Sequence, residues 1–176
     1  MDKNQKLIEM LYSHLNDEQK ELCELVINYL LELGYSMKKY KNSQTPFAIQ
    51  FKKPGITIAR IGIGKQSVTG ETPFLFMLKY NASDNYSEKF QYPLRQTLQK
   101  YQSKTKDTKR KHFPTSPTCG VCTLCDGKPQ YYRFTSDDGE TFTHCAGFMM
   151  NINDLTMDDF CEIKRHIRNQ NDYTIS

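Results

Sequence analysis

The sequence contains no tryptophan, and its aliphatic content is low. Of its 176 residues 38% are hydrophobic, but that fraction includes 11 tyrosines. Without tyrosine and with the nine glycines, about 37% of the chain is apolar, below the roughly 45–50% usual in globular domains. We therefore expect one domain whose core depends on the 10 phenylalanines and 11 tyrosines. The composition is otherwise ordinary, which excludes collagen-like and low-complexity chains.

The chain also lacks a long hydrophobic run. Its longest apolar stretch, residues 25–33, is interrupted by Asn28 and Glu32, whereas a membrane-spanning helix needs about 20 apolar residues. The first residues, from Met1 to Lys6, lead into a charged helical pattern and not into the apolar centre of a secretory signal. These absences predict a cytoplasmic, bacterial-type protein with no membrane partner. In that compartment the six cysteines are not expected to form three disulfides.

Helical spacing of apolar residues predicts four helices. They cover residues 3–14, a segment capped by Asn16 or Asp17 and ended by Gly34, residues 86–102, and a last segment capped by Thr156. Pro93 lies inside the third pattern, so that helix is expected to start near Tyr92 or to be kinked there.

Alternating and continuous apolar residues predict the strands. Residues 46–52 and 56–63 form a hairpin, residues 74–78 a strand buried on both faces, and residues 131–134 and 142–150 a second hairpin joined through Asp137-Asp138-Gly139. A two-residue turn there would pair Tyr132 with Cys145. The order of elements predicts an α+β fold. Its antiparallel sheet packs with N-terminal, middle and C-terminal helices, and a Cys-rich loop leads into the C-terminal β-hairpin.

Three segments follow from this order. Residues 1–102 hold the helical start, the sheet and the middle helix. Residues 103–118 form a basic, proline-containing linker loop. Residues 119–176 hold the Cys-cluster loop, the β-hairpin and the C-terminal helix, and are expected to form one compact domain with residues 1–102.

Four of the six cysteines lie between residues 119 and 145. Cys119, Cys122 and Cys125 have two overlapping C-x2-C spacings, and Cys145 follows about twenty residues later. This pattern predicts a structural Zn²⁺ site, which needs four ligands in a closed tetrahedral set. His144 competes with Cys145 for the fourth position, but neighbouring residues of a strand point to opposite faces.

Two other interpretations of the cysteines stay open. Three cysteines at this spacing and a remote fourth can also hold a [4Fe–4S] cluster, although Ala146, not proline, follows Cys145. The four thiols can equally be free. Cys23 and Cys161 lie in predicted helices and are expected to be small core residues.

No catalytic motif is evident. Gly62, Gly64 and Lys65 do not match a phosphate-binding loop, because no helix follows them. His14 and His166 are expected to be solvent-facing helix residues. These observations favour a binding or regulatory module with a structural metal site over a metal- or redox-handling protein. A small enzyme whose site is assembled from residues distant in the sequence stays a third hypothesis.

The net charge of +4 is unevenly distributed. Residues 1–34 carry three basic and seven acidic residues, residues 35–113 carry 16 and four, and residues 114–176 carry five and nine. The middle segment therefore has a charge of +12, including a basic run from Lys104 to Lys111. It predicts either attraction to the chain's own acidic flanks or an anionic partner such as a nucleic acid.

Parts of the chain resemble small bacterial proteins of the frataxin-like, iron-chaperone-like group, in which a helical start precedes an antiparallel sheet. The matching stretches are Ile56–Gly62, Pro73–Lys79 and Tyr86–Phe90, followed by Asp138-Gly139, His144-Cys145 and the acidic-then-basic last helix. Most of that group has no assigned activity. The resemblance implies acidic iron ligands on an early helix, for which Glu18, Glu21 and Glu24 are the candidates, although a charged outer helix face explains them equally well.

Overall fold

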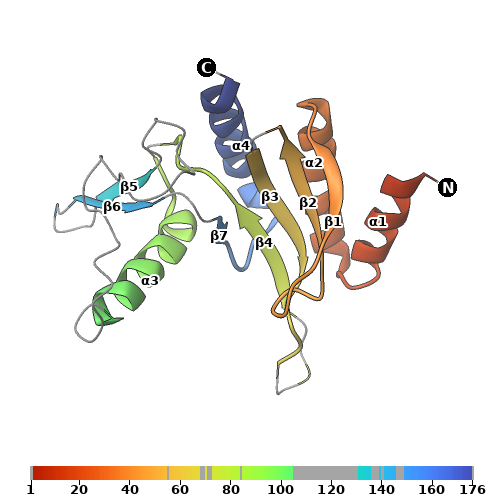
Figure 1. Cartoon of the computed structure of the whole chain (residues 1–176), viewed down its shortest axis with the longest axis horizontal. Helices are drawn as coiled ribbons and strands as arrows, with labels where there is room; N and C mark the ends of the chain where they lie inside the picture. The colour runs from red at the N-terminus through yellow and green to blue at the C-terminus, as the bar shows by residue number, and fades with distance from the viewer. Residues whose placement is uncertain are drawn as a thin grey trace.

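A computed structural model of the chain describes residues 2–54, 56–67, 70, 73–83, 85–104, 131–135, 139, 141–145 and 149–175 (Figure 1). Its elements are, in chain order, α1 (Lys3–Tyr12), α2 (Asp17–Glu32), β1 (Ser36–Tyr40), β2 (Phe47–Lys53), β3 (Ile56–Ile63), β4 (Phe74–Leu78), α3 (Glu88–Lys104), β5 (Tyr131–Thr135), β6 (Thr141–Cys145), β7 (Met150–Asn151), the 3₁₀ turn η2 (Met157–Asp159) and α4 (Phe160–Ile175). Five strands form an antiparallel sheet in the order β1-β2-β3-β4-β7, and β5 and β6 form a separate sheet. The predicted α+β class, with N-terminal, middle and C-terminal helices, is confirmed.

The start and end of α2 follow directly from local sequence. The Asn16 side chain accepts a hydrogen bond from the Gln19 backbone N–H at 2.8 Å, and the Gln19 side chain accepts one from the Asn16 N–H at 3.2 Å. This capping box satisfies two amide groups that the helix itself leaves without partners. After the helix, Gly34 has φ +83°, a conformation that favours glycine. Both predicted ends of the helix are confirmed.

The third helix covers most of the predicted range 86–102. It begins at Glu88 and contains Pro93, so a start near Tyr92, one of the two alternatives predicted from the proline, is wrong. The Ser87 carbonyl accepts from the backbone N–H groups of Phe90 and Gln91, which forms the first turn. The proline therefore removes one helical hydrogen bond near the start of α3 without ending the helix.

The predicted hairpin of β2 and β3 is present and contains a β-bulge. Phe51 pairs with Ala59 but the next residue, Lys52, pairs with Thr57, so Ile58 is the extra residue. Ile58 and Ala59 are both fully buried. The bulge explains why the buried isoleucines of β3 depart from strict alternation between Ile58 and Ile61.

Two strands differ from the prediction. β1, with the sequence SMKKY, was not predicted, because only Met37 of this edge strand is buried and no apolar alternation marks it. The single strand predicted over residues 142–150 is wrong. β6 ends at Cys145, and Met150 and Asn151 instead pair with Leu78 and Met77 at the other edge of the large sheet.

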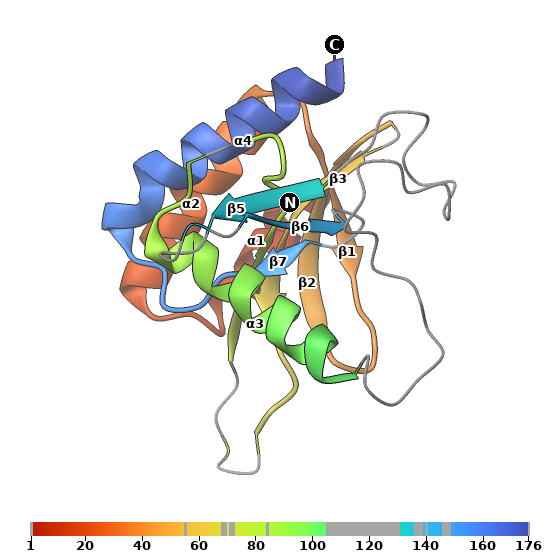
Figure 2. The ribbon, with the colours of Figure 1, turned by 90° about the vertical axis from the view of Figure 1, so that its left-hand side faces the viewer.

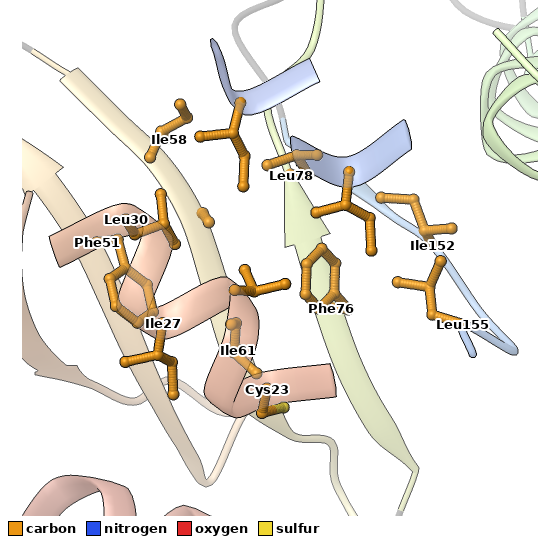
Figure 3. Close-up of a cluster of buried hydrophobic side chains, with 14 of the residues drawn as sticks. Cys23, Ile27, Leu30, Phe51, Ile58, Ile61, Phe76, Leu78, Ile152 and Leu155 are labelled. Carbon is orange, nitrogen blue, oxygen red and sulfur yellow. The ribbon is translucent and has the colours of Figure 1, made fainter. Parts of the chain in front are cut away.

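The core lies between one face of the large sheet and the helices α1, α2 and α4. Figure 2 shows α2 and α4 side by side, with α1 behind the strands. Figure 3 shows Cys23, Ile27 and Leu30 of α2 pointing towards Phe51, Ile61 and Phe76 of the sheet. As the composition predicts, aromatic side chains make up much of this core. The largest fully buried residues include Tyr80, Tyr132, Phe51, Phe76 and Phe90.

Candidate functional site

The predicted metal ligands fall mostly outside the described residues. Cys119, Cys122 and Cys125 are among those not described, while His144 and Cys145 end β6. The predicted pairing of Tyr132 with Cys145 is wrong, because Tyr132 pairs with His144 and Tyr131 with Cys145. The strands stop at Thr135 and resume at Thr141, so the connection is longer than a two-residue turn. Within the described part of the chain, no three His, Cys, Asp or Glu residues form a cluster that would hold a metal.

The structure also describes the two helix cysteines and the acidic residues of α2 that the resemblance proposes as iron ligands. Cys23 is buried in the core, as predicted, but Cys161 is exposed, so its prediction as a core residue is wrong. Glu18, Glu21 and Glu24 all lie on the exposed side of α2. They belong to no ligand cluster that the described residues form.

His166 of α4 is fully buried, which corrects the prediction of a solvent-facing residue. Its Nδ1 lies 2.8 Å from Ser83 Oγ and its Nε2 lies 3.1 Å from Glu162 Oε1. The ring also packs against Tyr80, Tyr86 and Phe90, with centroid distances of 5.3, 5.7 and 4.7 Å. The connection between β4 and α3 therefore packs directly on α4 through this histidine.

The environment of His166 keeps its ring neutral. Burial lowers the pKa of His166 to about 4, against the opposing effect of the Glu162 carboxylate. For Glu162 burial acts to raise the pKa, but hydrogen bonds from Ser87 and the neighbouring His166 outweigh it and hold the pKa below its usual value. In the neutral ring Nε2 donates to Glu162, so Nδ1 accepts the hydroxyl proton of Ser83.

Ser83, His166 and Glu162 have the hydrogen-bond order of a catalytic triad, but their burial argues for a structural role. Ser83 is only 3% exposed, and its Oγ also accepts from Asn169 Nδ2 at 3.2 Å. A shallow depression nearby is lined by Asn85, Tyr86, Ser87, Cys161, Glu162 and Arg165. Ser83 does not line it, so a substrate there would not reach the hydroxyl.

Tyr80 links this cluster to the small sheet. Its ring lies 5.0 Å from that of Tyr132 in β5, measured between centroids, and its hydroxyl donates to the Phe90 carbonyl at 2.7 Å. Tyr132 is itself fully buried, with 1% of its surface exposed. The β5–β6 hairpin is therefore anchored on the main core by an aromatic contact.

The face of the large sheet that points away from α2 carries polar side chains. Cross-strand pairing places Lys38, Gln50, Arg60 and Met77 in one row across β1, β2, β3 and β4. A second row contains Tyr40, Ala48, Gly62 and Leu75. We call the side chains of Lys38, Tyr40, Gln50, Lys52, Arg60, Leu75 and Met77 the basic sheet face.

The side chains of the basic sheet face reach solvent. Lys38 is exposed, and the other six are partly exposed. The prediction that residues 74–78 are buried on both faces is therefore wrong at Leu75 and Met77. The helix α3 and the β5–β6 hairpin lie beyond the edge of the sheet farthest from β1, where α3 contacts β7 (Figures 1 and 2).

Arg60 is held in place on the basic sheet face. Its Cζ lies 4.0 Å from the centroid of the Tyr40 ring, and its Nε donates to Gln50 Oε1 at 3.0 Å. The Tyr40 hydroxyl in turn accepts from Asn42 Nδ2 at 2.8 Å. No described carboxylate lies within ion-pair distance of this guanidinium, so its charge is not neutralised within the described fold.

The strands around Arg60 are free of acidic residues. Residues 35–67 contain no Asp or Glu and seven basic residues, which are Lys38, Lys39, Lys41, Lys52, Lys53, Arg60 and Lys65. None of these seven forms an ion pair with a described residue, whereas Lys20, Lys89 and Arg95 each do. Direct ion pairs with the chain's acidic flanks therefore do not neutralise this charge among the described residues, and both predicted explanations, attraction to those flanks and an anionic partner, stay predictions.

Not every basic residue of this stretch belongs to the face. Lys53 donates to Asn171 Oδ1 at 2.8 Å and lies over the Tyr35 ring, and Lys39 lies over Phe47. The basic run that follows Lys104 lies outside the described residues. Sequence reasoning identified the charge of the segment but not Arg60 or Tyr40 in particular.

Comparisons of the chain with protein families, with curated proteins and with solved structures find no match. The resemblance to the frataxin-like group therefore stays a prediction. None of the helices among the described residues is both long and apolar enough to span a membrane.

Proposed function

We propose that this chain is a binding module that binds nucleic acid through the phosphate backbone, using the basic sheet face. The observation that carries the proposal is the positive charge of residues 35–67, where seven basic residues and no acidic one occur and none of the seven forms an ion pair with a described residue. A group of cations without acidic partners is the electrostatic feature that attracts a polyanion.

The arrangement of the charges supports the same function. Lys38 and Arg60 flank Gln50 in one cross-strand row, and Lys52 lies beside them on β2. Neighbouring strands are about 4.8 Å apart, so a row across three strands extends roughly 10 Å. Charges spread over that distance match successive phosphates of a nucleic-acid strand better than one small anion.

A salt titration tests this proposal. Binding of a fluorescently labelled oligonucleotide is measured by anisotropy at increasing salt concentrations. If three or four phosphates are neutralised, the logarithm of the association constant should fall with the logarithm of salt with a slope of about −2 to −3. No binding at low salt, or binding that is insensitive to salt, would contradict the proposal.

We further propose that a structural zinc ion stabilises the β5–β6 hairpin, with Cys119, Cys122, Cys125 and Cys145 as ligands. A two-stranded sheet is marginally stable by itself, and β5–β6 is separate from the large sheet. Cys145 ends β6 opposite Tyr131, the first residue of β5, and the chain enters β5 six residues after Cys125. Zinc at this end of the hairpin would contribute directly to its folding.

Metal analysis of protein purified without oxygen tests the zinc proposal. We expect one zinc per chain in the wild type, its loss in Cys145→Ser, and its retention in the control Cys161→Ser, because Cys161 is an exposed free thiol. A brown protein that absorbs near ~400 nm would favour the [4Fe–4S] alternative instead. A folded protein without metal would contradict both metal hypotheses.

A further inference from the structure

We propose that Arg60, held between Tyr40 and Gln50, is a stacking platform for an unpaired base, so that the basic sheet face binds single-stranded nucleic acid in preference to a duplex. This inference rests on the proposed function and specifies its ligand.

The guanidinium of Arg60 is oriented before any ligand binds. The Tyr40 ring supports one side of it at 4.0 Å, and the hydrogen bond from Nε to Gln50 Oε1 fixes its rotation. Tyr40 is itself fixed through its hydroxyl by Asn42. Because these contacts already restrict the long side chain, little conformational entropy remains to be lost on binding.

The floor beneath this stack is built from small residues. Tyr40 lies in β1 and Arg60 in β3, so their side chains meet over the intervening strand β2. Beneath the stack, Ala48 of β2 and Gly62 of β3 are direct cross-strand partners, and both are buried. A larger side chain at either position would occupy the space through which Tyr40 reaches Arg60.

The neighbouring strand adds apolar surface. Met77 of β4 is the cross-strand partner of Arg60, and Leu75 precedes it on the same face. Both are partly exposed. Bases stack readily on guanidinium planes and apolar side chains, but in a duplex their faces are already stacked on one another. Lys38 is the cross-strand partner of Gln50, Lys52 lies two residues further along β2, and both are placed to neutralise phosphates.

Phosphate neutralisation by Lys38 and Lys52 and base stacking on Arg60 can be measured independently. Phosphate neutralisation determines the salt slope, and stacking determines the affinity at one fixed salt concentration. A substitution of Arg60 that keeps its charge should therefore change the second quantity without changing the first.

The test compares Arg60→Lys with wild type on a labelled single strand of about 12 nucleotides and on the matching duplex. We expect the wild type to prefer the single strand, and Arg60→Lys to weaken single-strand binding roughly tenfold with an unchanged salt slope. Arg168→Lys, on the exposed surface of α4, is the matched control and should bind as the wild type does.

The outcomes separate the inference from the proposed function. If Arg60→Lys binds the single strand as tightly as the wild type, the stacking role is wrong and phosphate binding still stands. Equal affinity of the wild type for duplex and single strand would also overturn the inference. If the wild type binds neither probe, the proposed function fails. Thermal melts of both variants confirm that the fold is intact.

Discussion

Replacing Gly62 with alanine is expected to lower the free energy of unfolding by about 3 kcal/mol, the upper part of the range for overpacked cores. A Cβ at this position would overlap the carbonyl oxygen of Phe47 and would lie 2.5 Å from the Cα of Ala48. Both are backbone atoms of β2, so no side-chain rotation can relieve the overlap. The pairing of β2 with β3 at the centre of the sheet would have to open.

Gly139→Ala is the matched control for this substitution. Gly139 has φ +85°, which alanine adopts with strain, but among the described residues no atom lies within 4 Å of the position that its methyl group would occupy. We expect a loss of about 1 kcal/mol from backbone strain alone. Chemical denaturation of both variants measures the difference, and equal losses would contradict the steric explanation.

Acidification between pH 6.5 and pH 4 is expected to destabilise the protein by about 3 kcal/mol through His166 alone. Burial lowers the folded-state pKa of His166 to about 4, whereas in the unfolded chain it has its ordinary value of 6.5. In this window the unfolded state binds a proton that the folded state does not, so stability falls as the pH falls. Above pH 6.5 the contribution is fully present.

Two charged groups near His166, Glu162 and Arg165, also affect how stability depends on pH. Glu162 opposes the lowering of the His166 pKa, and Arg165 assists it. The pKa of Glu162 is itself held below its usual 4.5, so its own contribution to stability is lost only below about pH 4.5. The titration of His166 therefore dominates the upper part of the window.

Denaturation of wild type, His166→Gln and His14→Gln across this pH range checks the prediction. His166→Gln should be less stable at pH 7 but should lose the slope between pH 6.5 and 4.5. His14→Gln is the control, because His14 lies on the exposed surface after α1. It should keep the slope of the wild type, and a slope that survives in His166→Gln would contradict the assignment.

Local sequence patterns predicted the elements that depend on nearby residues. The capping box of Asn16 and Gln19, the left-handed Gly34 and the hairpin of β2 with β3 all follow from contacts within a few positions or from strong alternation. The edge strand β1 was missed because a strand with one buried side chain carries no periodic signal.

The features that depend on distant contacts were not predictable in the same way. His166 follows Ile163 by three positions, on or beside the inner face of α4, and Glu162 precedes it by one helical turn. The partners that pack on it lie in the connection after β4 and at the start of α3, more than 70 residues earlier. The sequence pattern identified Arg60 as a polar residue of the predicted strand over residues 56–63. Its stacking partner Tyr40 lies in β1, the strand that was not predicted.

The most direct test of nucleic-acid binding by the basic sheet face is a comparison of two charge reversals in the anisotropy titration. One variant carries Lys38→Glu and Lys52→Glu on this face. The other carries Lys3→Glu and Lys6→Glu on the exposed surface of α1, which packs on β2 from the helix side of the sheet. Both change the net charge equally. We predict at least a tenfold loss of oligonucleotide affinity for the first and a change within about twofold for the second. Equal losses in the two variants, or no loss in the first, would contradict this function.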